Sequence, residues 1–313
     1  MRILITGGHG YIGGRLTQYF CKNKSYNVVV GTRKKTFSKI ADLDYNVLQL
    51  NWNSNRHLND VCRGTNVILH LAGMNLKESN LDPISAIKFN TLTTAKFIAA
   101  AINQGVEKFI YFSTAHVYRN PLKGVITENS LTHSLDSYAI SNRAAEDIVR
   151  SAVHNGKIDG CVIRLSNSFG APINKEVNCW SLVINDLCRQ AIINKKMELK
   201  STGLQRRDFI TIEDVCLATD HLISSKNLKT NLFNLGGDWS PSILDVANLI
   251  QERTFILFGY KPEIYVNKYS NEKSYKLTYK SELIKKNGFK LSSNRIEEID
   301  NLLFFCTRNF KLY

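Results

Sequence analysis

The sequence lacks any long apolar segment. No run of 18 or more apolar residues occurs in the 313-residue chain, although 43% of its residues are hydrophobic. A helix needs about 20 such residues to cross a bilayer, so we predict no membrane span. The first residues enter a β-strand pattern at once and lack the apolar core of a signal peptide. We therefore expect a cytoplasmic protein of one large domain or two modest ones.

Closely spaced cysteines and dense basic blocks are also missing. The seven cysteines are scattered and include no C-x-x-C pair, which favours free thiols and predicts no zinc site. The net charge is +14, and a basic surface can attract nucleic acid, anionic membranes or acidic metabolites. Dispersed, solvated lysines explain this charge more simply, so we predict no nucleic-acid partner.

Short apolar runs alternate with helical patterns through the first half of the chain. The runs are β-branched and nearly continuous, as expected for parallel strands covered on both faces. Alternation of strands and helices indicates an α/β fold with a Rossmann-type doubly wound parallel sheet. Strands are predicted at 2–6, 27–31, 46–50, 66–73, 108–113 and 160–165, and long helices at 84–104 and 135–153.

A glycine-rich turn follows the first strand and opens the first helix. Gly7, Gly10 and Gly13 form a G-x-x-G-x-x-G spacing. Glycines permit a tight turn and a close approach of the backbone to a pyrophosphate, and the helix N-terminus offers N–H groups to its charge. The turn therefore predicts dinucleotide binding.

No carboxylate stands at the end of the second strand. The sequence there is VVVGTRKK, with Thr32 where an acid would bind the ribose hydroxyls of NAD. An arginine at this place pairs with the 2′-phosphate of NADP, and Arg33 has the planar fork that suits phosphate. We predict NADP(H) in preference to NAD. The alternative is that Arg33, Lys34 and Lys35 form a solvated basic loop.

After about residue 165 the pattern loosens. We expect an amphipathic helix over 178–192, a strand and a helix over 207–223, a strand over 231–237, and a polar, mixed remainder over 239–313. Thr211 and Asp214 fit a capping box. We assign 1–165, with about 207–238, to an NADP-binding domain. Residues 166–206 and 239–313 form a smaller C-terminal substrate-binding region beside the ligand crevice.

These motifs resemble those of the short-chain dehydrogenase/reductase superfamily. TGGHGYIG is similar to its extended branch of NAD(P)-dependent epimerases, dehydratases and reductases, which act mainly on nucleotide sugars, and further matches cover nearly the whole chain. The resemblance implies that the backbone of Tyr11 and Ile12 faces the pyrophosphate. It also implies cofactor-adjacent roles for Leu71, Ala72, Gly73, Asn90, Tyr138 and Asn142.

The stretch FSTAHVYR resembles the fifth-strand motif of that family. Aligned on Val117 and Tyr118, it makes Thr114 the hydroxyl that binds the substrate oxygen, and Tyr138 follows 24 residues later. The resemblance implies that Tyr138 exchanges a proton with the sugar hydroxyl or ketone. This is general acid–base chemistry by a group with an unperturbed pKa near 10.

The lysine that the family places one turn after this tyrosine is replaced by Asn142. That lysine binds the nicotinamide ribose and lowers the pKa of the tyrosine. Arg143 is adjacent but points about 100° around the helix, so it is not an easy substitute. Alcohol oxidation needs tyrosinate, whereas ketone reduction needs the protonated tyrosine. We therefore expect Asn142 to harm oxidation, and epimerisation that begins with oxidation, more than reduction.

Ala115 and His116 take the places where sugar 4,6-dehydratases of the family carry acids. His116 has a pKa suited to proton transfer, although a structural or substrate-contacting histidine is the simpler interpretation. On the substrate side, RLSNSFG resembles the family's R-x-x-N-x-Y-G, which implies that Asn167 contacts the sugar or its phosphate. LQRRDFI resembles the diphosphate-gripping segment, which implies that Arg207 binds phosphate oxygens.

The leading hypothesis is NADPH-dependent reduction of a nucleotide-linked keto sugar, of the 4-ketoreductase type, in polysaccharide or deoxysugar biosynthesis. One alternative is an NAD(P)-dependent nucleotide-sugar 4-epimerase. Another is a non-catalytic protein that binds NADP(H) or a nucleotide-diphosphate sugar, because Asn142 replaces the lysine. The family resemblance also implies a homodimer packed through helices 84–104 and 135–153.

Overall fold

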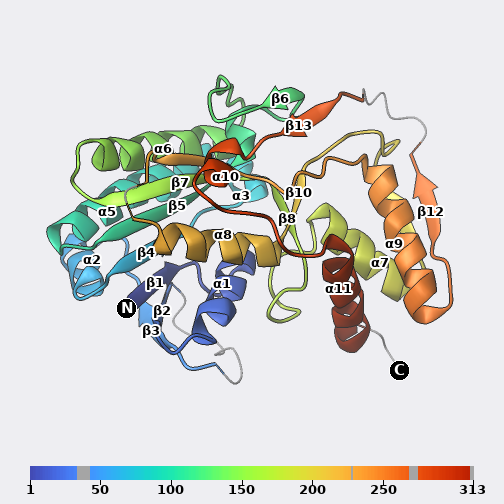
Figure 1. Cartoon of the computed structure of the whole chain (residues 1–313), viewed down its shortest axis with the longest axis horizontal. Coiled ribbons are helices and arrows are strands. Elements are labelled where there is room, and N and C mark those ends of the chain that lie inside the picture. Colours follow the sequence, from blue (N-terminus) through green and yellow to red (C-terminus); the bar gives the residue numbers. More distant parts are fainter. Residues whose placement is uncertain (34–42, 227, 268–273, 311–313) are drawn as a thin grey trace.

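The computed structural model describes residues 1–33, 43–226, 228–267 and 274–310. At its centre is a seven-stranded parallel sheet with the strand order β11-β7-β5-β4-β1-β2-β3 (Figure 1). The strand order reverses direction at β1, which confirms the predicted doubly wound α/β fold. The strands are β1 (Arg2–Thr6), β2 (Asn27–Thr32), β3 (Asn46–Gln49), β4 (Val67–His70), β5 (Lys108–Thr114), β7 (Asp159–Leu165) and β11 (Leu232–Leu235).

Helices cover both faces of this sheet (Figure 1). On one face lie α1 (Tyr11–Cys21) and α8 (Ile212–Ser224); on the other lie α2 (Asn55–Cys62), α5 (Thr93–Asn103) and α6 (Ser137–His154). Ile3 and Ile5 belong to the first apolar core, whereas Leu4 between them belongs to the second. Because successive strand residues point to opposite faces, burial on both sides produces the continuous apolar runs of the sequence.

Three predicted segments differ from the structure by more than two residues at an end or in their helix type. The expected strand 66–73 ends at His70, and 71–73 form a loop. The expected helix 84–104 is built from α4 (Pro83–Ala86), a π-helical segment η1 (Ile87–Leu92) and α5. The helix expected at 178–192 is α7 (Val183–Asn194), because residues 177–182 form turns in which Leu182 N–H donates to Cys179 O.

The C-terminal region contains more regular structure than the sequence pattern predicted. It holds α9 (Ile243–Phe258), α10 (Glu282–Lys286), α11 (Arg295–Phe310), β12 (Glu263–Val266) and β13 (Leu277–Tyr279). An apolar core formed by α7, α9, α11 and β9 (Lys196–Leu199) lies to the right of the main sheet in Figure 1. Three parallel strand pairs complete the fold: β9 with β12, β6 (Gly124–Ile126) with β13, and β8 (Asn167–Phe169) with β10 (Phe209–Thr211).

Of the capping box predicted for α8, the structure shows only the hydrogen bond to the N-cap side chain. Thr211 Oγ1 accepts a hydrogen bond from Asp214 N–H at 3.1 Å. The Asp214 carboxylate does not complete a capping box; it accepts from the backbone N–H groups of Ser292 and Ser293 at 3.0 and 3.2 Å. Asp214 therefore ties α8 to the segment before α11. Across the described ranges, no helix has both the length and the apolar character that a membrane span requires.

Candidate functional site

The glycine-rich turn lies between β1 and α1. Gly7 has φ of +70°, which L side chains rarely adopt, and a Cβ on Gly13 would lie 2.3 Å from Gly7 O. Gly10 N–H closes the turn by donating to Gly7 O at 2.8 Å. Because α1 begins at Tyr11, the N–H groups of Tyr11 and Ile12 fall in its first turn, where backbone donors have no helical acceptor. This geometry fits a bound pyrophosphate.

The loop after β4 faces the glycine turn. Leu71 N–H and Ala72 N–H both donate to Thr6 Oγ1, at 3.1 and 3.2 Å. A Cβ on Gly7 would lie 3.2 Å from Ala72 N, so the two loops approach each other closely. The structure thus brings together the predicted cofactor residues of the first and fourth strands.

Asn90 connects this loop to the helix of Tyr138. Its side chain is buried in the π-helical segment η1. Asn90 Oδ1 accepts from Met74 N–H at 2.7 Å, and Asn90 Nδ2 donates to Ser141 Oγ at 2.9 Å. A Cβ on Gly73 would lie 3.3 Å from Asn90 Oδ1. These bonds give Asn90 a structural role; its cofactor-adjacent role stays a prediction.

An aromatic cluster lies beside Arg33 at the end of β2. The exposed Arg33 guanidinium lies 5.1 Å from the centroid of the Phe89 ring, and Trp52 meets the same ring edge-on at 6.0 Å. Lys34 and Lys35 lie outside the described residues. Sequence reasoning gave no role to Phe89, because nothing in its local pattern marks it. A cavity of about 420 Å³ beside Trp52 is lined by Gln49, Leu50, Asn51, Asn53 and His57.

Thr114 and Tyr138 meet at the junction of β5 and α6. Thr114 is the last residue of β5, Tyr138 is the second residue of α6, and a side-chain hydrogen bond joins them. Burial raises the pKa of Tyr138 above its ordinary value near 10; the Thr114 bond lowers it and the nearby Asp136 carboxylate raises it, with a net upward shift. Tyr138 therefore holds its proton at neutral pH.

Asn142 is buried and bonded on both ends of its amide. Its Oδ1 accepts from the Tyr111 hydroxyl at 2.8 Å, and its Nδ2 donates to the backbone carbonyl of Tyr138, also at 2.8 Å. Tyr111 is itself buried on β5, and sequence reasoning missed it because it reads as one more aromatic residue of an apolar strand. The amide thus binds the main chain of Tyr138 and a neighbouring phenol.

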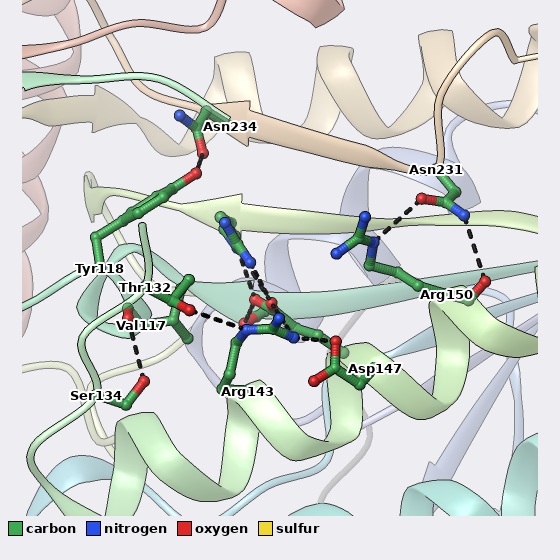
Figure 2. Close-up of polar contacts among 12 residues, drawn as sticks. Val117, Tyr118, Thr132, Ser134, Arg143, Asp147, Arg150, Asn231 and Asn234 are labelled. Atoms are coloured by element: carbon green, nitrogen blue, oxygen red, sulfur yellow. Dashed lines mark hydrogen bonds and ion pairs between the residues drawn. The ribbon is translucent and has the colours of Figure 1, made fainter. Parts of the chain in front are cut away.

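Arg143 does not replace the missing lysine, as the helical geometry predicted. Its Nε donates to Thr132 Oγ1 at 3.3 Å, and its Nη1 pairs with the carboxylate of Asp147 one turn further along α6 (Figure 2). These contacts direct the guanidinium toward the 127–132 loop.

His116 lies against the Thr114–Tyr138 pair. It belongs to a short 3₁₀ turn, η2 (Ala115–Val117); its N–H donates to Thr114 Oγ1 at 3.2 Å, and its ring meets Tyr138 edge-on at 6.0 Å. Burial lowers the pKa of His116 below 6.5; Asp136 raises it and Arg207 lowers it, and the net shift is downward. Within the described residues, its buried Nδ1 has no hydrogen-bond partner.

Two of the predicted substrate residues, Asn167 and Arg207, lie at the start of β8 and just before its partner strand β10. Asn167 begins β8, and its Nδ2 donates to the backbone carbonyl of Asp208 at 2.9 Å. Arg207 precedes β10, and its Nε donates to Gln205 Oε1 at 2.9 Å. Arg207 is close enough to His116 for its charge to lower the pKa of that imidazole.

Asp208 is a buried acid that sequence reasoning did not single out. Burial raises its pKa to about 7, although hydrogen bonds such as the one from Gly237 N–H, at 3.0 Å, lower it. Its second oxygen accepts from Ser240 Oγ at 3.3 Å. Asp208 therefore fixes the segment that carries Arg207 against the loop after β11. The only feature of the sequence that could have pointed to Asp208 is its position directly before the short apolar strand FIT.

Comparison with known families matches residues 3–236 to the NAD dependent epimerase/dehydratase family. This chain belongs to that family. The predicted resemblance and the predicted class, an NAD(P)-dependent oxidoreductase or epimerase, are thereby confirmed. The family match spans the glycine turn, the Thr114–Tyr138 pair and the Arg207 segment.

Among the curated relatives of this chain, some are named as dehydratases and others as epimerases. It is 28% identical over 273 residues to a protein of Dictyostelium discoideum named dTDP-D-glucose 4,6-dehydratase; the match covers 80% of this chain and 61% of that protein. It is 24% identical over 269 residues to the UDP-glucose 4-epimerase of Azospirillum brasilense, covering 80% and 77%.

Solved structures of similar fold align over almost the whole chain. One is MoeE5 in complex with UDP-glucose and NAD, with a TM-score of 0.82, 22% identity and coverage of 98% of this chain and 99% of that one. Another is the UDP-glucose 4-epimerase of Thermotoga maritima with UDP-glucose, with a TM-score of 0.82, 20% identity and coverage of 97% and 98%. At these identities the likeness confirms the fold.

Proposed function

We propose that this chain reduces the keto group of a nucleotide-linked sugar with NADPH. The observation that carries the proposal is the bonding of Asn142, whose neutral amide pairs with Tyr111 at the position where the family has a lysine. Tyr138 is therefore without the adjacent cation that would favour tyrosinate. With an ordinary pKa near 10, only about one tyrosine in a thousand is ionised at pH 7; burial reduces that fraction further.

The proposed mechanism assigns a role to each side chain at the substrate. The Tyr138 hydroxyl donates its proton to the carbonyl oxygen of the sugar, and the Thr114 hydroxyl binds the same oxygen and orients it. Arg207 binds the diphosphate with its planar fork, and Asn167 contacts the sugar or its phosphate. Nicotinamide, when bound, supplies the hydride for the carbonyl carbon.

The cofactor is proposed to lie along the loops after β1, β2 and β4. The turn of Gly7, Gly10 and Gly13 and the first N–H groups of α1 hold the pyrophosphate. The exposed Arg33 binds the 2′-phosphate of NADP. Trp52 and the adjoining cavity of about 420 Å³ receive the adenine. Asn90 contributes by fixing α6 beside the loop after β4, and Asn142 by fixing α6 to Tyr111 of β5.

We further propose the division of the chain and its assembly. Residues 1–165 with about 207–238 form the NADP-binding domain, and 166–206 with 239–313 form the substrate-binding region. A homodimer would pack through α4, η1, α5 and α6, the elements that span the expected helices 84–104 and 135–153, together with the contacting α3 (Leu76–Leu81). The exposed apolar side chains of these elements are Leu81, Ile84, Ile87, Leu92 and Ile140; their burial in a dimer would remove apolar surface from water.

A nucleotide-sugar 4-epimerase is the second candidate. The names of several relatives favour it, among them the UDP-glucose 4-epimerase of Azospirillum brasilense. An epimerase must first oxidise its substrate, so it requires a tyrosinate at Tyr138 or another base close to the sugar hydroxyl.

The deciding experiment supplies UDP- and dTDP-linked 4-keto sugars and follows NADPH consumption, with mass spectrometry of the product. The proposal predicts stoichiometric reduction that Tyr138→Phe abolishes. Interconversion of UDP-sugars that carry a 4-hydroxyl group, without added cofactor, would support the epimerase instead. Tight NADPH binding with neither reaction on any of these sugars would support the non-catalytic binding protein.

A further inference from the structure

A second cavity, of about 280 Å³, lies beside α6 and is lined by three arginines. Arg143 and Arg150 are seven residues, about two turns, apart on α6, so they share one side of the helix (Figure 2). Arg164 enters from β7 and is almost fully buried. The remaining lining residues are Glu128, Asn129, Ser130, Leu131, Thr132, Thr230, Leu232 and Leu283. We name this cavity the arginine pocket.

Two of the three guanidinium charges are neutralised by carboxylates of α6. Arg164 binds the fully buried Glu146 with two nitrogens, through Nε–Oε1 and Nη2–Oε2 contacts of 3.0 and 2.7 Å. Arg143 pairs with Asp147. These acids are therefore occupied, and they do not compensate further charge in the pocket.

Arg150 is the cation of the pocket that lacks an acidic partner. Within the described part of the chain it forms no ion pair, and its Nε donates to the neutral side-chain oxygen of Asn231 at 3.2 Å (Figure 2). Glu128 also lines the pocket, but its Oε1 already accepts from Asn234 N–H and Leu283 N–H, at 3.1 and 3.3 Å. The remaining donors of Arg150 are thus available to a ligand.

Two hydroxyl groups add donors to the same wall. Ser130 Oγ accepts from Thr127 N–H at 3.0 Å, and Thr132 Oγ1 accepts from Arg143 Nε. Since each oxygen is an acceptor in these bonds, its own proton can be donated to a ligand. A pocket with guanidinium and hydroxyl donors fits a tetrahedral oxyanion, whose several oxygens are all acceptors.

We propose that the arginine pocket binds a phosphate group, either inorganic phosphate or the phosphate of a small metabolite, at a site separate from the cofactor and sugar sites. A volume of about 280 Å³ admits a phosphate or a hexose phosphate but no nucleotide sugar. The helix α6, which carries both Tyr138 and Arg143, connects the pocket with the catalytic residues. The 127–134 loop connects them as well, since its Ser134 Oγ donates to Val117 O at 3.1 Å (Figure 2).

The test is calorimetric titration with inorganic phosphate and, separately, with glucose 1-phosphate, at constant ionic strength in chloride. Four proteins are compared: wild type, Arg150→Gln, Asn231→Ala and Arg207→Gln. Asn231→Ala removes the neutral partner of Arg150 but keeps the charge. Arg207→Gln removes the diphosphate contact of the proposed function, so the two phosphate sites are distinguished.

The expected result is one phosphate site in the wild type that Asn231→Ala and Arg207→Gln retain and Arg150→Gln weakens at least about tenfold. If only one of the two titrants binds, that result shows whether the ligand is inorganic phosphate or a phosphorylated metabolite. Binding that Arg207→Gln abolishes and Arg150→Gln retains would overturn the proposal, as would no binding of either titrant to the wild type. If Arg150→Gln does not fold, Arg150→Lys replaces it, with weaker binding expected because a lysine has no planar fork.

Discussion

Tyr111 donates a buried hydrogen bond of 2.8 Å to the side-chain oxygen of Asn142. The same amide donates to the backbone carbonyl of Tyr138, one turn earlier on α6. Two buried polar side chains thus satisfy each other without any charge, which avoids the cost of an unpaired buried donor or acceptor. As a consequence, Asn142 holds the first turns of α6 against β5 but carries no positive charge that would stabilise the ionised form of Tyr138.

Replacing Asn142 by lysine should favour oxidation over reduction. A cation within about 4–6 Å lowers the pKa of an acid by roughly 1–3 units, so tyrosinate at neutral pH should rise at least about tenfold. We expect the rate of alcohol oxidation to rise by about the same factor and ketone reduction to change less. Both single-turnover rates are measured with the same sugar pair.

The control for this change is Asn142→Met, which is unbranched like lysine and only one atom shorter but is neutral. It should lose the Tyr111 bond without gaining oxidation. Equal gains of Asn142→Lys in both directions, or a gain in Asn142→Met, would show that charge at position 142 does not set the direction.

The pH dependence of reduction should follow the protonated form of Tyr138. Its pKa is raised from 10, so the proton donor is present through neutral pH and is lost only above about pH 10. The pKa of His116 is lowered from 6.5, so its imidazole stays neutral until the pH falls below that value. The single-turnover rate should therefore be flat from about pH 6.5 to 10. A midpoint near pH 8 would contradict this assignment.

Phenylalanine at position 138 provides the matched variant. It keeps the ring and its edge-on contact with His116 but removes the donor. General acid catalysis contributes about 10²–10⁴-fold, so reduction should fall by that factor while NADPH binding is unchanged. A loss below about fivefold would point to a different proton donor.

The parts of the molecule that sequence reasoning captured are those with a local physical cause. Gly7 and Gly13 could be predicted because a positive φ and a 2.3 Å approach admit no side chain. The strand runs could be predicted because burial on both faces leaves only apolar residues. Thr211 could be predicted as a cap from its spacing to Asp214.

The parts that sequence reasoning missed depend on contacts between distant segments. Tyr111 and Asn142 are 31 residues apart, and only the packing of β5 against α6 brings them together. Asp214 was assigned to a local cap, whereas its carboxylate binds Ser292 and Ser293, nearly 80 residues away. The helices α9 and α11 were missed because the stretch 239–313 was judged by its polar composition as a whole, although α9 itself is rich in apolar residues.

Removing the arginine at the end of β2 should change the choice of cofactor. Charge-assisted hydrogen bonds contribute about 1.5–3 kcal/mol, which corresponds to roughly a 10- to 100-fold change in affinity. Arg33→Ala should weaken NADPH binding by this factor and leave NADH binding nearly unchanged, because NADH lacks the 2′-phosphate. Fluorescence titration with both dinucleotides measures the effect. Arg56→Ala, on α2, is the control for loss of surface charge. If Arg33→Ala weakened the binding of NADH and NADPH equally, Arg33 would contact only the adenine that both cofactors share, and not the 2′-phosphate.

The buried pair of Arg164 and Glu146 should control stability more than any surface ion pair. Glu146 accepts from Arg164 and, at 2.5 Å, from Ser113, and both charged side chains are almost fully buried. Glu146→Leu leaves an uncompensated buried guanidinium, which costs about 3–5 kcal/mol. The free energy of unfolding in urea should fall by that amount.

The double variant Glu146→Leu with Arg164→Met should recover most of this loss, because it removes both buried charges and fills similar volume. The matched surface control is Glu213→Gln, whose partner Arg15 lies 3.3 Å away while the Glu213 side chain is 41% exposed. Solvent screens this pair, so the control should cost no more than about 1 kcal/mol. An equal loss of unfolding free energy in Glu146→Leu and Glu213→Gln would contradict this prediction, because it would mean that water solvates the Arg164 guanidinium. In that case the double variant would recover none of the lost stability.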